Sequence, residues 1–178
     1  MMIVSFELGV AFCQIVVYDP GSDGIIHDWT EQQGRQGFSW RPSSVAFGMI
    51  GQAPELSTEV WLANEINLRA DTVRAILVPF DVGKSGTVRV SDVADLGKEV
   101  TMVQGKYALV FETGFINEEE YKNYPDYDEQ DAQWGLLPMW CRLTFIPSES
   151  VQPEILRQDA ELSSSYPLLM EAEPAHSP

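Results

Sequence analysis

Short apolar runs separated by turn-forming residues constrain the fold of this chain more than any other feature. Seven runs rich in Val, Ile, Phe, Tyr and Trp are bounded by clusters of Gly, Pro, Asn, Asp and Ser, which is the pattern of an antiparallel sandwich or barrel. The sequence therefore predicts an all-β fold, an antiparallel β-sandwich. Its predicted strands span 3–8, 11–18, 44–49, 59–66, 73–80, 106–112 and 139–146, with weaker candidates at 24–28, 87–90 and 99–103.

Glycine and proline lie where the predicted strands must reverse direction. The segments 19–24, 83–86 and 104–105 supply the residues that tight turns require, and 83–86 is predicted to form a hairpin tip. Pro79 lies inside an apolar run, where it removes one donor from the hydrogen-bond ladder. We therefore expect Pro79 at a sheet edge or at a bulge.

The length of 178 residues allows one domain and an appendage. We expect a β-sandwich domain over 1–147, with a long acidic loop at 117–131 inserted in it, and a C-terminal extension over 148–178. One short helix is predicted at 153–162, because proline suits the first position of a helix and Glu154 complements the helix dipole.

Acidic residues far outnumber basic ones. The chain has 27 Asp and Glu against 11 Lys and Arg, which gives a formal net charge of −16. This charge disfavours nucleic acid and anionic lipid as direct partners and favours a basic protein surface or a cation. Seven acids and one Lys fall within 117–131, and six acids and one Arg lie beyond residue 147, so the charge is localised.

The sequence also bears on location. No stretch reaches the roughly 18 apolar residues that a membrane-spanning helix needs. The N-terminal segment lacks a basic start and contains Glu7, so we expect a first strand there and not a signal peptide, which predicts a cytoplasmic protein. Cys13 and Cys141 lie in apolar runs, where we expect two buried thiols.

Motifs of catalytic sites are absent from the sequence. It contains no Gly-rich phosphate loop, no Gly-x-Ser-x-Gly elbow, no Cys-x-x-Cys pair and no His-Glu-x-x-His. His27 and His176 are the two histidines, and His27 is expected at a strand end rather than as a general base. We therefore expect no enzymatic activity, no cofactor and no metal.

The acidic loop at 117–131 is the candidate functional segment. Tyrosines and a following Trp are interleaved with its carboxylates, and aromatic anchors among charges are typical of a protein-binding surface. Carboxylates at phosphate-like spacings can occupy the basic cleft of a nucleic-acid enzyme, which amounts to DNA mimicry. The predicted partner-binding residues are Glu118, Glu119, Glu120, Tyr121, Tyr124, Asp126, Tyr127, Asp128, Glu129, Asp131 and Trp134.

Two other readings of this loop stay open. A solvated acidic loop without a specific role is common on protein surfaces. Asp126, Asp128, Glu129 and Asp131 also resemble a calcium loop, although the central Gly and the Glu at its twelfth position are missing. The alternative function is accordingly a calcium- or lipid-binding β-sandwich module.

Four short motifs resemble the competence protein J (ComJ) family. They are 14–18 (Gln-Ile-Val-Val-Tyr), 28–30 (Asp-Trp-Thr), 78–80 (Val-Pro-Phe) and 105–107 (Gly-Lys-Tyr), in the order of the family. The resemblance extends over 4–114 and implies an inhibitor of a DNA-entry nuclease, a metal-dependent endonuclease that cuts DNA during uptake.

This sequence departs from the family pattern in its longer acidic loop and its extra C-terminal residues. These insertions would also suit an immunity protein that neutralises a toxic nuclease. The expected partner is in either case a basic, metal-dependent nuclease that binds the acidic loop.

Overall fold

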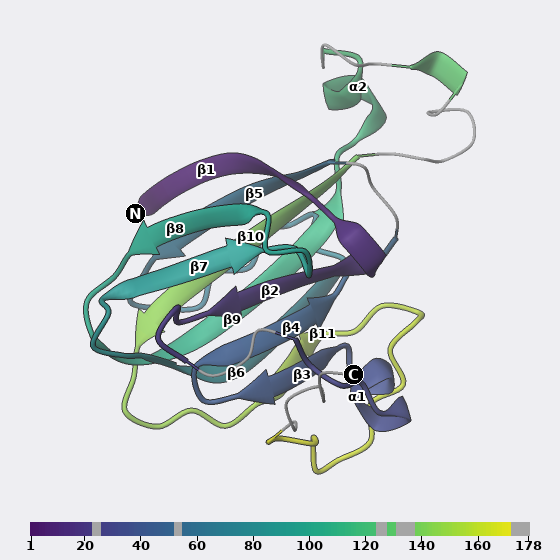
Figure 1. Ribbon diagram of the computed structural model, residues 1–178. Helices are drawn as coiled ribbons and strands as arrows, with labels where there is room; N and C mark the ends of the chain where they lie inside the picture. The colour runs from purple at the N-terminus through teal and green to yellow at the C-terminus, as the bar shows by residue number, and fades with distance from the viewer. Residues whose placement is uncertain (23–25, 52–54, 124–127, 131–137, 172–178) are drawn as a thin grey trace.

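The chain folds into two β-sheets that lie as two layers (Figure 1). The computed structural model describes residues 1–22, 26–51, 55–123, 128–130 and 138–171. Strands dominate these residues, as predicted, and the helices among them are short, the longest having six residues. None of the helices in these ranges is long and apolar enough to cross a membrane.

The larger sheet has six strands in the order β1-β5-β10-β9-β6-β11. Neighbouring strands are antiparallel except β5 and β10, which run parallel. The prediction of purely antiparallel pairing is wrong for this pair. Side chains alternate between the two faces in parallel and antiparallel strands alike, so the sequence pattern does not reveal the direction of pairing. Parallel neighbours need a long connection, and the strands β6, β7, β8 and β9 lie between β5 and β10 in the chain. The bounds are β1 (Met2–Gly9), β5 (Glu55–Leu62), β6 (Arg74–Val82), β9 (Gly105–Phe115), β10 (Met139–Pro147) and β11 (Glu154–Arg157).

The smaller sheet has five strands in the order β3-β4-β2-β7-β8, and all its pairs are antiparallel. The weak predictions at 87–90 and 99–103 correspond to real strands. Of the weak prediction at 24–28, residues 24 and 25 lie outside the described residues, and 26–28 holds only an isolated bridge at His27. The bounds are β2 (Gln14–Tyr18), β3 (Phe38–Arg41), β4 (Ser44–Gly48), β7 (Thr87–Ser91) and β8 (Gly97–Thr101), with η1 (Ala11–Cys13), α1 (Glu31–Gln36) and α2 (Glu118–Tyr121) between strands.

Both sheets contribute to one hydrophobic core. Phe47 of β4 stacks on Phe111 of β9 with ring centroids 4.5 Å apart. Tyr107 and Phe80 meet Phe145 edge-on within the same core, which is a favourable arrangement for aromatic rings. Both cysteines are free thiols, and Cys141 is buried in this core as expected, whereas Cys13 is only partly buried and packs against it. Most strands that supply this core were predicted from the sequence, but β3 was not, and its Phe38 is fully buried in the same core.

The helix expected at 153–162 is wrong, because β11 forms there and pairs with β6. Its apolar residues fit a strand: Ile155 packs on the main core, and Leu156 packs on a small cluster on the opposite face of the sheet. Pairing with the open edge of β6 therefore outweighs the local helix signal. Because β11 reaches only as far as Leu77, Pro79 has a strand partner on one side only, β9, as predicted for an edge position.

His27 bridges two hydroxyl groups inside the protein. Its Nδ1 lies 3.0 Å from Ser39 Oγ and its Nε2 lies 2.8 Å from Ser44 Oγ, and the residue is buried. Burial, with a smaller contribution from the charge of Arg41, lowers the pKa of His27 to about 3. The imidazole is therefore neutral near pH 7 and has a structural role.

This lowered pKa predicts a loss of stability on mild acidification. The unfolded histidine takes up a proton near its usual pKa of about 6.5, whereas the folded one does not, so stability falls as the pH drops from there toward 3. When the pH falls from about 7.5 to about 5, His27 is expected to lower the free energy of unfolding by about 2 kcal/mol. Urea unfolding at both pH values measures this loss, and His27→Gln should be less sensitive by that amount. An equal loss in the variant contradicts the assignment.

Candidate partner-binding site

The acidic segment begins where β9 ends, and α2 projects beyond the ends of β9 and β10 (Figure 1). Asn117 caps this helical turn, since its side chain accepts a hydrogen bond of 2.9 Å from the Glu120 backbone N–H. Three acids follow in the first turn, where the helix dipole favours negative charge. The local sequence thus builds a capped turn that displays carboxylates.

Tyr121 attaches this turn to the larger sheet. Its ring is 6% exposed and packs against Ile116 and against Trp140 of β10. Its hydroxyl oxygen accepts a hydrogen bond of 3.3 Å from the Asp128 backbone N–H. Contrary to the expectation from the sequence, Tyr121 is not an exposed aromatic anchor, because its ring is needed to hold α2 in place.

The other predicted site residues fall into two groups. Five carboxylates are exposed, and within the described residues only Glu118 among them has an ion pair, at 3.0 Å with Lys122. The exposed set is Glu118, Glu119, Glu120, Asp128 and Glu129. The remaining predicted contacts, Tyr124, Asp126, Tyr127, Asp131 and Trp134, lie outside the described residues.

Across the part of the chain that the structure describes, no three His, Cys, Asp or Glu side chains are grouped to hold a metal ion. The calcium hypothesis depends on Asp126 and Asp131, which lie outside those residues.

A pocket of about 370 Å³ adjoins α2 on the outer face of the larger sheet. Ser57 and Glu59 of β5 line one side, and Trp140, Arg69 and Glu120 line the others. These residues come from separate segments of the chain, and no motif in the sequence indicates that they meet. The pocket is therefore the part of the site that sequence reasoning missed.

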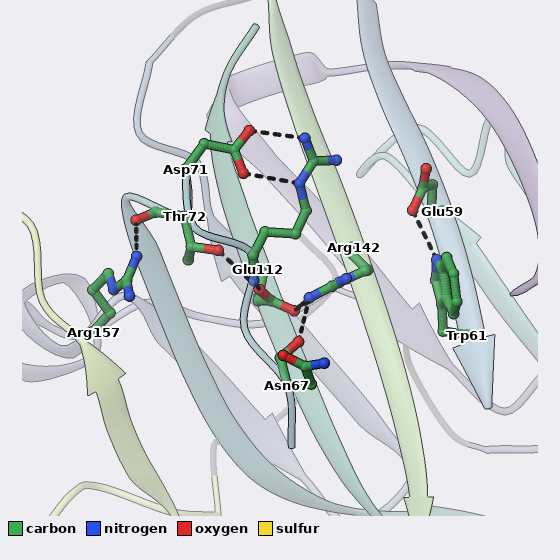
Figure 2. A network of polar contacts seen from close by, with 9 residues as sticks. Glu59, Trp61, Asn67, Asp71, Thr72, Glu112, Arg142 and Arg157 are labelled. Atoms are coloured by element: carbon green, nitrogen blue, oxygen red, sulfur yellow. Dashed lines mark hydrogen bonds and ion pairs between the residues drawn. The ribbon is translucent and has the colours of Figure 1, made fainter. Parts of the chain in front are cut away.

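A network of ion pairs fixes the sheet face next to this pocket (Figure 2). Glu112 of β9 is 1% exposed and pairs with Arg142 of β10, with 2.6 Å between Oε2 and Nη2. Its other oxygen accepts hydrogen bonds from the Thr72 hydroxyl at 2.8 Å and from the Arg69 backbone N–H at 2.9 Å. A buried carboxylate needs such partners, so this network holds the segment before β6 on the sheet.

The Arg69 guanidinium is held by two neighbours. It donates to both carboxylate oxygens of Asp71 at 2.9 and 2.8 Å, and it lies 4.0 Å from the ring centroid of Trp140. These hydrogen bonds are the main cause of the lowered pKa of Asp71 and the raised pKa of Arg69. The positive charge of Arg69 at the pocket wall is therefore already balanced by Asp71.

Comparison with known proteins identifies the family. The family model of competence protein J (ComJ) matches residues 7–146. The crystal structure of ComJ from Bacillus subtilis, described as an inhibitor of the DNA degrading activity of NucA, is 14% identical with a TM-score of 0.62. That match covers 83% of this chain and 98% of the Bacillus chain.

A second solved structure, described as crocagin biosynthetic gene J, is 12% identical with a TM-score of 0.48, over 82% of this chain and 96% of its own. No protein with a curated description matches the chain. The family match includes the four motifs found in the sequence and continues through the acidic segment into β10. The resemblance is thereby confirmed, and the chain belongs to the competence protein J (ComJ) family.

Proposed function

We propose that this chain is an inhibitor or immunity protein that binds a DNA nuclease and blocks its active site. The observation that carries the proposal is the set of exposed carboxylates on and beside α2, fixed to the sheet by Tyr121. Membership of the ComJ family supports it, since the Bacillus relative is described as inhibiting the DNA degrading activity of NucA.

The physical basis is charge complementarity. A nuclease that cuts DNA presents Lys and Arg toward the phosphate backbone, and carboxylates spaced along a protrusion can bind the same groups. The strong negative charge of the chain steers such a partner toward it and speeds association. The inhibitor itself carries out no chemistry, so rigidity is what it must supply.

The proposed scaffold is a β-sandwich in which the shared core keeps the acidic segment fixed. The partner is a basic, metal-dependent nuclease, whose metal ion one of the carboxylates can reach. The proposed contact surface, called the acidic face below, consists of the five exposed carboxylates together with Tyr124, Asp126, Tyr127, Asp131 and Trp134.

An inhibition assay tests this function. The full chain, immobilised, is used to capture proteins from its native cells, and the captured fraction is assayed for DNA degradation. We expect a nuclease that the free chain inhibits at a ratio of about one to one, with slower association as salt rises from about 0.05 M to about 0.5 M. Capture of no DNA-degrading activity, or a captured nuclease that the chain leaves active, contradicts the proposal.

A further inference from the structure

We infer that the pocket beside α2 receives one arginine or lysine side chain of the partner protein. This inference rests on the proposed function and names a specific contact within it. The pocket adjoins the acidic face, because Glu120 belongs to both. A basic side chain of a bound nuclease can therefore enter the pocket while its neighbours meet the exposed carboxylates.

The lining of the pocket suits a long cationic side chain. Ile116 and Trp140, both largely buried, form the apolar part of the lining for an aliphatic stem, and Glu59 and Glu120 supply carboxylates for its charged end. Long basic side chains bury their stems and keep their charged groups near polar partners. The volume of about 370 Å³ accommodates such a side chain.

The charges around the pocket leave two carboxylates without a cation. Arg69 is bound by both oxygens of Asp71, and Arg142, although it lies opposite Glu59 across the strands, is paired with Glu112. Four carboxylates and two guanidinium groups therefore lie around the pocket, with a net charge of −2. They are Glu59, Asp71, Glu112, Glu120, Arg69 and Arg142. No ion pair within the described residues involves Glu59 or Glu120.

Glu59 is the better placed of these two carboxylates. Its side chain is half-buried, and its Oε2 accepts one hydrogen bond of 2.7 Å from the Trp61 indole N–H (Figure 2). A carboxylate can accept several hydrogen bonds, so Glu59 keeps capacity for a bound guanidinium or ammonium. Both Glu59 and Glu120 add to the rise in the pKa of Arg69, after the larger effect of Asp71, as expected of charges that face one space.

Other occupants fit this lining less well. An anion would meet two carboxylates, and the one cation on the wall is already bound by Asp71. An uncharged apolar group would remove water from Glu59 and Glu120 without replacing its hydrogen bonds, which is unfavourable. A basic side chain satisfies both carboxylates.

The first test uses N-acetyl-arginine amide as a probe, independent of any nuclease. It is titrated into the full chain while the indole N–H signal of Trp140 is followed by nuclear magnetic resonance. We expect the Trp140 signal to shift and to saturate. Glu59→Gln should lower the affinity for the probe by at least about tenfold, and its side-chain oxygen can still accept the hydrogen bond from Trp61. Glu65→Gln, exposed beyond the end of β5, serves as the matched control and should bind like the natural protein.

Two controls sharpen this titration. N-acetyl-norleucine amide has a similar stem without the charge and should cause no saturable shift. Glu120→Gln changes an exposed residue and cannot disturb the sheet, so it should weaken binding in a folded protein. A Trp140 signal that the arginine probe does not move, or an affinity that neither variant changes, overturns the inference.

The second test uses the nuclease captured on the chain. Glu59→Gln is expected to raise the dissociation rate by about tenfold and to leave the association rate within about twofold, because contacts with a half-buried charge act mainly on dissociation and exposed charges on association. Unchanged dissociation overturns the pocket but leaves the inhibitor function standing. If the natural chain inhibits no nuclease, the function fails, and the arginine titration still decides the pocket.

Discussion

Replacing Asp159 by alanine is expected to lower the free energy of unfolding by about 3–5 kcal/mol. Asp159 forms an ion pair with Arg74 of β6, and the side chains of the pair are 8% and 3% exposed. Arg74 also donates to the Gly48 carbonyl at 2.6 Å and meets Glu161 at 3.1 Å. Without Asp159, a buried guanidinium would keep only a carbonyl and an exposed carboxylate as partners, which is the costly case of a broken buried pair.

Glu161→Ala is the matched control, because Glu161 contacts the same guanidinium from an exposed position. Removing this partner is expected to cost less than about 1 kcal/mol. Urea unfolding of both variants measures the difference. If Asp159→Ala and Glu161→Ala lower the free energy of unfolding by amounts that agree to within about 0.5 kcal/mol, burial does not determine what the Asp159–Arg74 pair contributes to stability.

Neutralising the acidic face is expected to weaken inhibition by roughly 100-fold, mainly through slower association. The variant combines Glu118→Gln, Glu119→Gln, Asp128→Asn and Glu129→Gln, all at exposed positions. Only Glu118 has an ion pair within the described residues, with exposed Lys122, so the fold should lose little stability. Glu120 is retained so that the pocket keeps its charge.

The control variant makes the same change in net charge elsewhere. It combines Glu65→Gln, Glu149→Gln, Glu154→Gln and Glu171→Gln, at exposed positions away from α2 and the pocket. We expect its inhibition to fall by less than about threefold, because screening confines the effect of a charge to about 10 Å. Equal losses in the two variants would assign the effect to overall charge and would remove the acidic face from the site.

Strand pattern predicted the centre of this fold better than its edges. The run 107–111 is apolar on both faces, and β9 indeed lies between β10 and β6 with Phe111 on one side and Val110 on the other. The short strand β11 was not predicted, because it depends on pairing with β6, far away in the sequence. Local signals cannot report such a partner.

The same distinction applies to the candidate site. The acidic segment is visible in the sequence because its charges are consecutive, although the burial of Tyr121 is not. The pocket brings together Glu59, Arg69 and Trp140 from separate segments, and the hydrogen bond between Arg69 and Glu112 spans 43 positions. Only the sheet register makes these residues neighbours.

Competition with DNA for the captured nuclease is the most direct test of the central claim that carboxylates of this chain take the place of phosphates. A fluorescent DNA duplex is bound to the nuclease, with its metal ion removed to prevent cutting, and the chain is added while the anisotropy is followed. The natural chain should displace the duplex completely, and the acidic-face variant should displace it only at roughly 100-fold higher concentration. A stable ternary complex of nuclease, DNA and chain would contradict it.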